Sequence, residues 1–593
     1  MKKAERLSWF LVLCLSTGWL SLFAAPQHEK RFRRPVALAW TGDGYLAVAN
    51  RDTGSISLLD VGKRTVASET PVGKRITSLA ALPGGHHLLA TDEETHQLNL
   101  LRPQGANLRL LAQARAPHSP VNIKVSPDGA FATVTSLWSR RVSLFRVDLS
   151  ADVPSLRREY VADLPFPPRR QWINPAGDKL VVADAFADRL AILSLPTLRL
   201  LATRTLPGHN VGGLALSPNG TDLLVSHQIL NPLAPTTRSR IFWGTVMRNV
   251  VTGLELSDLL DLTRPPAAPI ARWKRYPVGA QNHGAGEPGS MLTARNGAFL
   301  LGIRGTGEVA VSPVLNGEWK RIPIGKRPVD ALLGPKENFA YFADVYGDAV
   351  RVIDLRDSPV LVSSISLGPT PKPGLLQRGE VLFHDSRLSL DGWFSCNSCH
   401  TGGHTSGRLN DNFDDHSFGT PKRVPSLLGT AETGPWTWNG LQGSLTTQVR
   451  QTLATTLLNG ERKHGRVSRE DEEALVSFLF TLPIPPPLTE AREEPPNPDF
   501  TRGKLLFGKL GCNDCHRNTL LTSPDEYDVG LSDEAGARLF NPPTLLGVSQ
   551  RDRFFHDGSA TSLRQVLDQA GHPDGGGLTQ TQLNRLLAYL RAL

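Results

Sequence analysis

The sequence predicts a multidomain protein in which an all-β seven-bladed propeller is followed by two mainly α domains. Two observations support this prediction. A strand pattern recurs between residues 35 and 368, and the remaining part of the chain contains the run Cys-x-x-Cys-His twice, each time between helical stretches. At 593 residues, the chain is also too long for one domain on the usual scale of about 100 to 200 residues per domain.

Short strand-like runs give the first part its repeat. They are rich in small and β-branched residues and most lie 40 to 48 residues apart, which is the period of a propeller blade. Turn signals such as Ser126-Pro127-Asp128-Gly129 precede them. The seven runs are Leu46–Asn50, Leu88–Asp92, Ala132–Ser136, Leu180–Asp184, Leu223–His227, Leu300–Arg304 and Ala340–Asp344.

The repeats resemble the YVTN-type repeat family through runs such as Tyr45–Asp52 and Asp348–Asp354. One interval between runs is 77 residues, which indicates an insertion at about residues 228–279 with a possible short helix at Ser257–Leu262. This insertion either reaches the C-terminal domains or a partner, or it decorates the surface. Propellers host many unrelated functions, so the repeat predicts architecture rather than chemistry.

The first residues have the pattern of an export signal. A basic start is followed by the uncharged run Leu7–Gln27, with small residues at Ala24 and Ala25. This predicts a signal peptide over residues 1–25 and a periplasmic location. An uncleaved membrane anchor is the alternative, because the run is close to the roughly 20 residues that a span needs.

Four of the five cysteines belong to the two Cys-x-x-Cys-His runs. Two cysteines at this spacing can form thioethers with one haem, and the adjacent histidine then becomes the proximal iron ligand. A zinc site or a thiol redox pair is the alternative, but neither requires a histidine after both pairs, and export suits haem attachment. The sequence therefore predicts two covalently bound haem c groups, held by Cys396, Cys399 and His400 and by Cys512, Cys515 and His516.

Helical stretches frame each of these runs. The first unit, residues 374–482, begins with the apolar stretch Leu375–Phe383 and ends with a helix capped from Ser468. The second unit, residues 499–593, ends with a helix capped by Thr579. Helix, haem motif, loop and closing helix is the order of a cytochrome c domain.

A proline-rich linker, residues 483–498, joins the two units. Prolines favour polyproline geometry, so this linker is expected to be an extended spacer.

Several segments of the C-terminal part form a recognisable set of motifs, namely Arg378–Leu388, Ser395–His400, Val424–Gly429, Trp438–Gly440, Asn541–Gly547 and Phe554–Gly558. This set resembles the motifs of the bacterial di-haem cytochrome c peroxidase and MauG family. The resemblance implies a periplasmic oxidoreductase in which one haem relays electrons, the other meets peroxide or oxygen, and a tryptophan lies between them. Either Trp436 or Trp438 can be that tryptophan, and an ordinary core position is the alternative for each.

Two departures from the family pattern bear on function. The family places a glutamine and then a catalytic glutamate after the Trp-x-Gly turn; Gln448 matches the glutamine, but the nearest following acid is Glu461. Breaking an oxygen–oxygen bond needs a group that moves a proton, so this departure counts against peroxide turnover. Lys422 and Arg423 stand where the family has the asparagine of a calcium site, and their positive charge argues against calcium.

Composition limits which residues can be the sixth ligands of the two irons. The three methionines are Met1, Met247 and Met291, so neither haem has a methionine ligand from its own domain, and both potentials should be lower than with methionine. We expect His416 at the first haem, because His404 lies too near His400 to reach the opposite face of the ring. The family resemblance implies His572 at the second haem, near the place of the family's distal ligand before the closing helix. The other candidates are His384, His404 and His464 for the first haem and Tyr527 and His556 for the second.

Charge is unevenly distributed and bears on partners. Residues 369–593 hold 22 Lys and Arg against 26 Asp and Glu, whereas the whole chain has a net charge of +9. The basic N-terminal part can dock on the acidic C-terminal part, meet an acidic redox partner, or carry charge that is simply solvated. Expected partners are a small redox protein (a cytochrome c or a cupredoxin) or a protein substrate, with no nucleic acid, and a membrane only if the signal stays uncleaved.

These observations predict a periplasmic di-haem c-type oxidoreductase of the cytochrome c peroxidase and MauG type. It would move electrons between two covalent haems and a peroxide, oxygen or protein substrate held near the propeller. The alternative is a non-catalytic electron-transfer or redox-sensing cytochrome with the propeller as docking module. No acid pair, metal cluster or nucleophile constellation stands out in residues 35–368, which counts against catalysis by the propeller itself.

Overall fold

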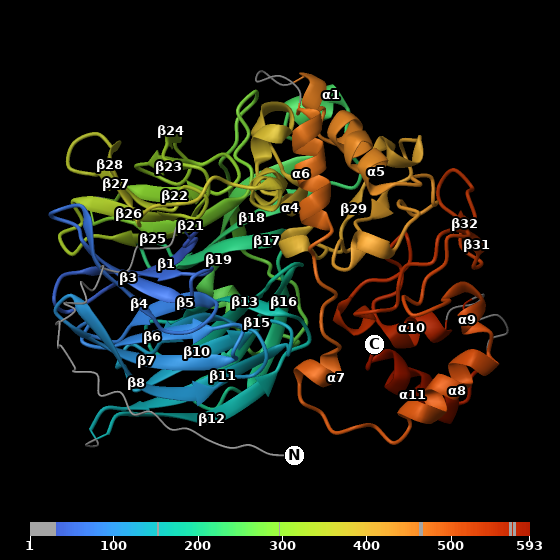
Figure 1. Cartoon of the computed structure of the whole chain (residues 1–593), viewed down its shortest axis with the longest axis horizontal. Helices are drawn as coiled ribbons and strands as arrows, with labels where there is room; N and C mark the ends of the chain where they lie inside the picture. Colours follow the sequence, from blue (N-terminus) through green and yellow to red (C-terminus); the bar gives the residue numbers. More distant parts are fainter. Residues whose placement is uncertain (1–30, 151–152, 296, 462–466, 569–571, 573–576) are drawn as a thin grey trace, which may run out of the picture.

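The computed structural model describes residues 31–593 except 151–152, 296, 462–466, 569–571 and 573–576. Figure 1 shows a large β-propeller on one side and two smaller, mainly helical domains on the other. The expected signal peptide, residues 1–25, lies outside the described residues. Within the described part, no helix combines the length and the apolar character needed to cross a bilayer.

The described residues of the N-terminal part form seven four-stranded antiparallel sheets, each built from four consecutive strands, so the predicted seven-bladed propeller is confirmed. The first strands of neighbouring blades contact one another around the ring and line its axis. Blades one to four contain β1 (Pro35–Trp40), β2 (Leu46–Asn50), β3 (Ser55–Asp60), β4 (Thr65–Pro71), β5 (Ile76–Ala81), β6 (Leu88–Asp92), β7 (Gln97–Gln104), β8 (Asn107–Arg115), β9 (Pro120–Val125), β10 (Phe131–Ser136), β11 (Arg141–Asp148), β12 (Ser155–Asp163), β13 (Pro168–Ile173), β14 (Lys179–Asp184), β15 (Arg189–Ser194) and β16 (Leu200–Thr205). Blades five to seven contain β17 (His209–Leu216), β18 (Asp222–Leu230), β19 (Met247–Glu255), β20 (Trp273–Pro277), β21 (Pro288–Thr293), β22 (Phe299–Ile303), β23 (Glu308–Ser312), β24 (Lys320–Pro323), β25 (Pro328–Leu333), β26 (Phe339–Asp344), β27 (Ala349–Asp354) and β28 (Val360–Ser366).

The seven runs that reveal the repeat all fall on the second strand of a blade. In β2, β6 and β10 every residue is buried. A strand covered on both faces by neighbouring blades needs small and β-branched residues throughout rather than an alternating pattern. This is why the repeat is most visible at these positions.

Each blade is built from its own four consecutive strands. The ring is therefore closed by contacts between the first and last blades and not by a strand from one end of the chain that joins a sheet of the other. The backbone N–H groups of Arg33 and Arg34 donate to the carboxylate of Asp348 (3.0 and 2.7 Å). Further along β1, the N–H of Leu38 donates to Asp330 (2.9 Å). Buried carboxylates that accept backbone N–H bonds thus fasten the N-terminal strand to blade seven.

The insertion reaches the first haem domain. It lies between β18 and β20 and contains α1 (Arg238–Phe242) and α2 (Leu256–Leu259). Ile241 and Met247 are buried in one hydrophobic cluster with Trp393 and other side chains of the haem domain. The prediction that the insertion reaches the C-terminal part is therefore confirmed for the segment between β18 and β19. The alternative, that this segment only decorates the surface, is wrong.

The C-terminal part forms two domains that repeat one arrangement: α3 crosses α6 in the first, and α8 crosses α11 in the second. A Cβ atom on Gly379 would overlap the carbonyl oxygen of Ala474, and one on Gly503 would overlap that of Arg585. Both crossings therefore need a glycine. The helices are α3 (Leu375–Phe383), α4 (Cys396–Cys399), α5 (Leu445–Gln451), the π-helix η6 (Thr452–Thr456), α6 (Arg469–Leu479), α7 (Leu488–Ala491), α8 (Phe500–Lys509), α9 (Cys512–Cys515), α10 (Leu563–Asp568) and α11 (Gln580–Leu590); short strands are β29 (Leu409–Asn410), β30 (Lys422–Arg423), β31 (Tyr527–Asp528) and β32 (Leu539–Phe540).

The linker between the haem domains is held against the propeller. It contains the short helix α7, so the expectation of a wholly extended spacer is wrong (Figure 1). Next to α7, Arg492 donates to the carbonyl of Ser139 (3.0 Å), and Arg141 donates to the carbonyl of Arg492 (3.0 Å). Leu488 and Ala491 are buried, and this packing outweighs the extended preference of the flanking prolines.

The propeller also holds the second haem domain. Arg140, only 6% exposed, donates to the side chains of Gln550 (3.2 Å) and Asp552 (2.9 Å). Gln550 in turn accepts a hydrogen bond at its carbonyl from the ring of His404 in the first haem domain (3.2 Å). All three parts of the chain therefore meet at Gln550.

Candidate functional site

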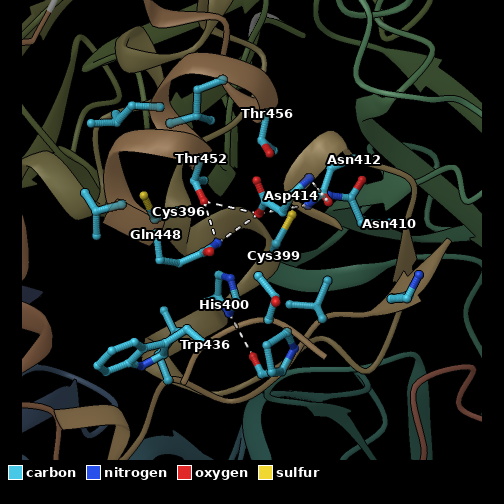
Figure 2. A pocket seen from close by; sticks show the side chains of 18 of the residues that line it. Cys396, Cys399, His400, Asn410, Asn412, Asp414, Trp436, Gln448, Thr452 and Thr456 are labelled. Atoms are coloured by element: carbon cyan, nitrogen blue, oxygen red, sulfur yellow. Dashed lines mark hydrogen bonds between the residues drawn. The ribbon is translucent and has the colours of Figure 1, made fainter. Parts of the chain in front are cut away.

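The first Cys-x-x-Cys-His run opens onto a cavity of about 190 Å³. Cys396, Cys399 and His400 all line it, and Figure 2 shows their side chains around the hollow. A cavity bordered by two thiols and a histidine, with largely apolar walls, fits a covalently attached haem. The apolar wall includes Phe383, Phe394, Leu445, Leu453, Leu475 and Leu479.

Both histidines of the two runs are oriented as metal ligands. The Nδ1 of His400 lies 2.9 Å from the carbonyl oxygen of Pro425, and the Nδ1 of His516 lies 3.1 Å from that of Leu521. When Nδ1–H donates to a carbonyl, the tautomer is fixed and Nε2 keeps its lone pair for iron. The residues present therefore fit the two c-type haems.

Polar side chains from three segments meet on one wall of the first cavity. Asp414 comes from the loop before β30, Gln448 from α5 and Thr452 from the π-helix η6. The Nε2 of Gln448 donates to Asp414 (3.0 Å), and the hydroxyl of Thr452 donates to the same carboxylate (3.3 Å), as the dashed lines of Figure 2 show. Burial raises the pKa of Asp414 to about 6, although these hydrogen bonds oppose the shift.

Several polar atoms on the cavity wall are buried without a partner. Within the described part of the chain, the Oε1 of Gln448, the Oδ1 of Asn410 and the hydroxyl of Thr456 have no hydrogen bond. Buried polar atoms are normally satisfied, so unpaired ones around a cavity indicate a place for a polar ligand. The π-helix that presents Thr456 is itself a rare feature that is frequent at functional sites.

Asp414 is a cavity residue that the sequence did not single out. It precedes Gln448 in the chain, whereas the family resemblance implies an acid after Gln448, and it approaches Gln448 only in the folded domain. Glu461, the nearest acid after Gln448, is exposed and forms an ion pair with Arg238 (2.6 Å). It does not line the cavity. The two aspartates at positions 414 and 415 after the first haem motif were the available signal.

The histidines considered as distal ligands of the first haem lie elsewhere. His416 is exposed and stacks beside Phe413 (ring centroids 6.2 Å apart), and the structure does not bring it to the cavity wall. His384 is bonded to Tyr346 and His404 to Ser426, each at 2.9 Å. His464 lies outside the described residues.

The two tryptophans play different structural parts, although both line the cavity. Trp436 donates its indole N–H to the hydroxyl of Thr430 within the first domain (3.0 Å). Trp438 donates to the carbonyl of Arg423 (2.7 Å), and its own carbonyl accepts from the N–H of Asn541 in the second domain (2.8 Å). Trp438 therefore touches both haem domains.

In the second domain, His572 faces the proximal histidine. The ring centroids of His516 and His572 are 6.4 Å apart. Two metal–nitrogen bonds of about 2 Å each, with about 1 Å from each nitrogen to its ring centre, require roughly this separation. His516 and His572 would therefore be placed to hold the second haem iron together.

The other two candidates in the second domain have different contacts. Tyr527 is hydrogen-bonded to Arg517 and to Ser523. His556 stacks on Phe540, with ring centroids 4.1 Å apart.

A buried carboxylate of the propeller supports the first haem motif. Glu287 is 0% exposed and accepts hydrogen bonds from Ser395 and from Asn397 (2.9 Å), the residues on either side of Cys396. Burial alone would raise the pKa of Glu287, but the nearby positive charge of Arg327 overrides it and lowers the pKa to about 2. The backbone of Glu287 has φ 61°, a strained value for a residue other than glycine.

A lysine bridges the two haem domains. The ammonium of Lys422 forms ion pairs with Asp415 of the first domain and Asp533 of the second (3.1 Å to the latter). A cation of the chain itself thus links the domains at the position where the sequence argued against calcium.

Comparison with known proteins agrees with this geometry. The family model described as di-haem cytochrome c peroxidase matches residues 375–477. The cytochrome c551 peroxidase of Nitrosomonas europaea is 22% identical over 37% of this chain and 79% of that protein. The methylamine utilization protein MauG of Methylorubrum extorquens is 28% identical over 34% of this chain and 70% of that protein.

Among solved structures, Kuenenia stuttgartiensis hydrazine synthase is similar with a TM-score of 0.48 and 20% identity, over 56% of this chain and 99% of that chain. The matched peroxidase family binds two c-type haems, and the cysteine pairs at 396/399 and 512/515 are consistent with two haems here. The C-terminal region of this chain is therefore similar to the di-haem cytochrome c peroxidase and MauG family, and it follows a seven-bladed β-propeller.

Proposed function

We propose that this chain is an exported di-haem oxidoreductase whose first haem site reacts with peroxide and whose second haem relays electrons to it. The observation that carries this proposal is the contrast between the two sites. The wall of the first site contains Asp414 and several polar atoms that lack a hydrogen bond among the described residues. In the second site, the rings of His572 and His516 are separated by a distance that suits two ligands of one iron. An open position suits a reacting iron, and two axial histidines suit a relay.

The side chains of the first cavity have separate tasks in this proposal. A haem attached at Cys396 and Cys399 and held through His400 would supply the redox chemistry of its iron toward a small oxygen ligand. Asp414 holds or releases the proton that must move between the two oxygens, and a pKa raised to about 6 suits that exchange near neutral pH. Gln448 fixes the orientation of Asp414 and keeps its own Oε1 free for the ligand.

The propeller acts in this proposal as a rigid frame for electron transfer. Its contacts through Glu287 and Arg140 fix the first and second haem domains respectively. Trp438, in contact with both domains, is the proposed bridge between the haems. Electrons would come from a small periplasmic redox protein.

The proposal is tested by optical and EPR spectra of the oxidised and reduced holoprotein, before and after adding cyanide, carbon monoxide and peroxide. We expect one haem that binds these ligands and one low-spin haem that ignores them. Two low-spin haems that ignore all three ligands would establish the alternative, a pure electron-transfer or sensing cytochrome. A change confined to the haem attached at Cys512 and Cys515 would reverse the assignment of the two sites.

A further inference from the structure

Positively charged side chains gather at the axis of the propeller. Lys124 lies on β9 and Arg169 and Arg170 lie on β13, the first strands of neighbouring blades, which line the axis. Within the described residues, none of these three side chains has an ion-pair partner. The Nε of Arg170 is buried and makes no hydrogen bond. Like charges that lie close together without a carboxylate partner repel one another, so the axis favours a negatively charged ligand.

A β-bulge presents the two arginines. On β13, Pro168 pairs with Asp184 and Gln171 pairs with Val182, so the two arginines between them face a single residue of β14. Bulges re-aim side chains and are frequent beside functional sites. The corresponding bulge of β21 carries Gly289 and Ser290 instead. The doubled charge therefore belongs to this blade and not to the propeller fold in general.

The carboxylates near the axis are too few to balance the cations. Burial lowers the pKa of Arg169 to about 10 and that of Arg304 to about 9, so both stay charged at neutral pH. Among the residues that the structure describes, the charges that act on one another here are five cations, Lys124, Arg169, Arg170, Arg304 and Arg327, and two carboxylates, Glu287 and Asp330.

Two further carboxylates, Glu93 and Asp184, also act on Arg169. Each has an arginine of its own, Arg75 at 3.1 Å and Arg189 at 2.9 Å. They therefore leave the positive surplus at the axis unchanged.

The axis has room for a small ligand, and one end meets the first haem motif. Lys124 is exposed although it lies on an innermost strand, so water-sized space remains beside it. Arg169 lies over the ring of Phe186 (5.4 Å to the centroid). Its guanidinium would be 3.3 Å from a Cβ atom on Gly402, two residues after His400. A ligand held here would therefore lie close to the first haem domain.

We propose that Lys124, Arg169 and Arg170 bind a small inorganic oxyanion of the phosphate class on the propeller axis. Guanidinium groups pair with oxyanions through two parallel hydrogen bonds, and hydrogen bonds between charged groups are stronger than neutral ones. A multivalent anion offsets the surplus of positive charge that the chain leaves unpaired. This site is separate from the peroxide site and does not depend on it.

The test is isothermal titration of inorganic phosphate into the holoprotein in an oxyanion-free buffer, with sodium chloride at equal ionic strength as the reference. We expect one saturable site, weakened at least tenfold in Arg170→Gln. Lys124→Gln is the second variant, because an exposed lysine can be replaced without disturbing the fold. Arg109→Gln, an exposed change on the outer strand β8, serves as the matched control and should bind as the native protein does.

Absence of saturable phosphate binding to the native protein would overturn the proposal. So would an affinity that is unchanged in both axis variants, since binding would then belong to surface arginines. Circular dichroism of each variant shows whether the fold is intact, so that loss of phosphate binding is not mistaken for unfolding.

Discussion

At the scale of single residues, the acid beside Gln448 in the first cavity is Asp414, which precedes Gln448 in the sequence. Asp414 and Gln448 lie on separate segments and meet only when the loop before β30 packs against α5. A motif search along the chain finds Gln448 but cannot find its partner, because the pairing is a tertiary contact. The proximal histidines were predictable because attachment chemistry fixes their spacing from the cysteines.

His572 gives a direct prediction at the second haem. Replacing it with methionine, His572→Met, should keep the iron low-spin and raise its reduction potential, because methionine ligation favours the reduced state. His572→Ala should instead turn this haem high-spin and open it to cyanide. Potentiometric titration with optical detection measures both effects. Spectra unchanged in both variants would remove His572 from the iron.

Glu287 predicts a stability effect at acid pH. Its folded pKa of about 2 lies below the ordinary value of 4.5, so its charge stabilises the fold above pH 4.5, and this contribution is lost as the pH falls toward 2. Glu287→Gln should lower the free energy of unfolding at pH 7 by about 3 kcal/mol or less, with a smaller difference at acid pH. Denaturant unfolding of the holoprotein between pH 3 and 7 measures it. A loss that is the same at every pH would show that the charge does not matter.

At the scale of elements, the repeat and the closing helices were predictable, whereas the contacts between elements were not. The caps at Ser468 and Thr579 form as expected, because capping depends on a few adjacent residues. The helix α7 and the docking of the insertion depend on surfaces far away in the sequence. Local pattern does not contain that information.

The glycine at the crossing of α8 and α11 offers a matched pair of variants. Gly503→Ala places a Cβ where the Arg585 carbonyl lies and should destabilise the second haem domain by about 1 to 3 kcal/mol. Gly508→Ala, in the same helix, meets nothing within 4 Å and should stabilise it by up to about 1 kcal/mol. Thermal unfolding followed at the Soret band compares them. Equal effects of the two changes would contradict the close crossing.

At the scale of the whole molecule, the propeller is the frame on which both haem domains rest. The composition already indicated that the two parts can dock on each other, since the N-terminal part is basic and the C-terminal part acidic. The opposite charges meet at particular residues: Arg140 and Arg189 of the propeller are both bound to Asp552 of the second haem domain. The net charges of the two parts do not predict which surfaces meet, because a net charge does not say where on the surface the charged side chains lie.

The Arg140 contact predicts a coupling between domain docking and electron transfer. Arg140→Ala removes one of the two arginines bound to Asp552, with Arg189 remaining, and should loosen the second haem domain, at a cost of about 1 to 3 kcal/mol in domain stability. Electron transfer between the haems should then slow. Arg141→Ala is the neighbouring control, since Arg141 binds the linker rather than Asp552. Flash-photolysis of the half-reduced protein measures the rate, and an unchanged rate in Arg140→Ala would mean that the propeller does not set the haem geometry.

The central claim is that Asp414 moves the proton when the first haem meets peroxide. Stopped-flow mixing of the holoprotein with hydrogen peroxide tests it most directly, with Asp414→Asn compared with Glu461→Gln, which changes an exposed acid outside the cavity. We predict that Asp414→Asn slows the spectral change of the first haem by about 10²- to 10⁴-fold at unchanged haem content, and that Glu461→Gln reacts like the native protein. A native rate in Asp414→Asn would contradict the account.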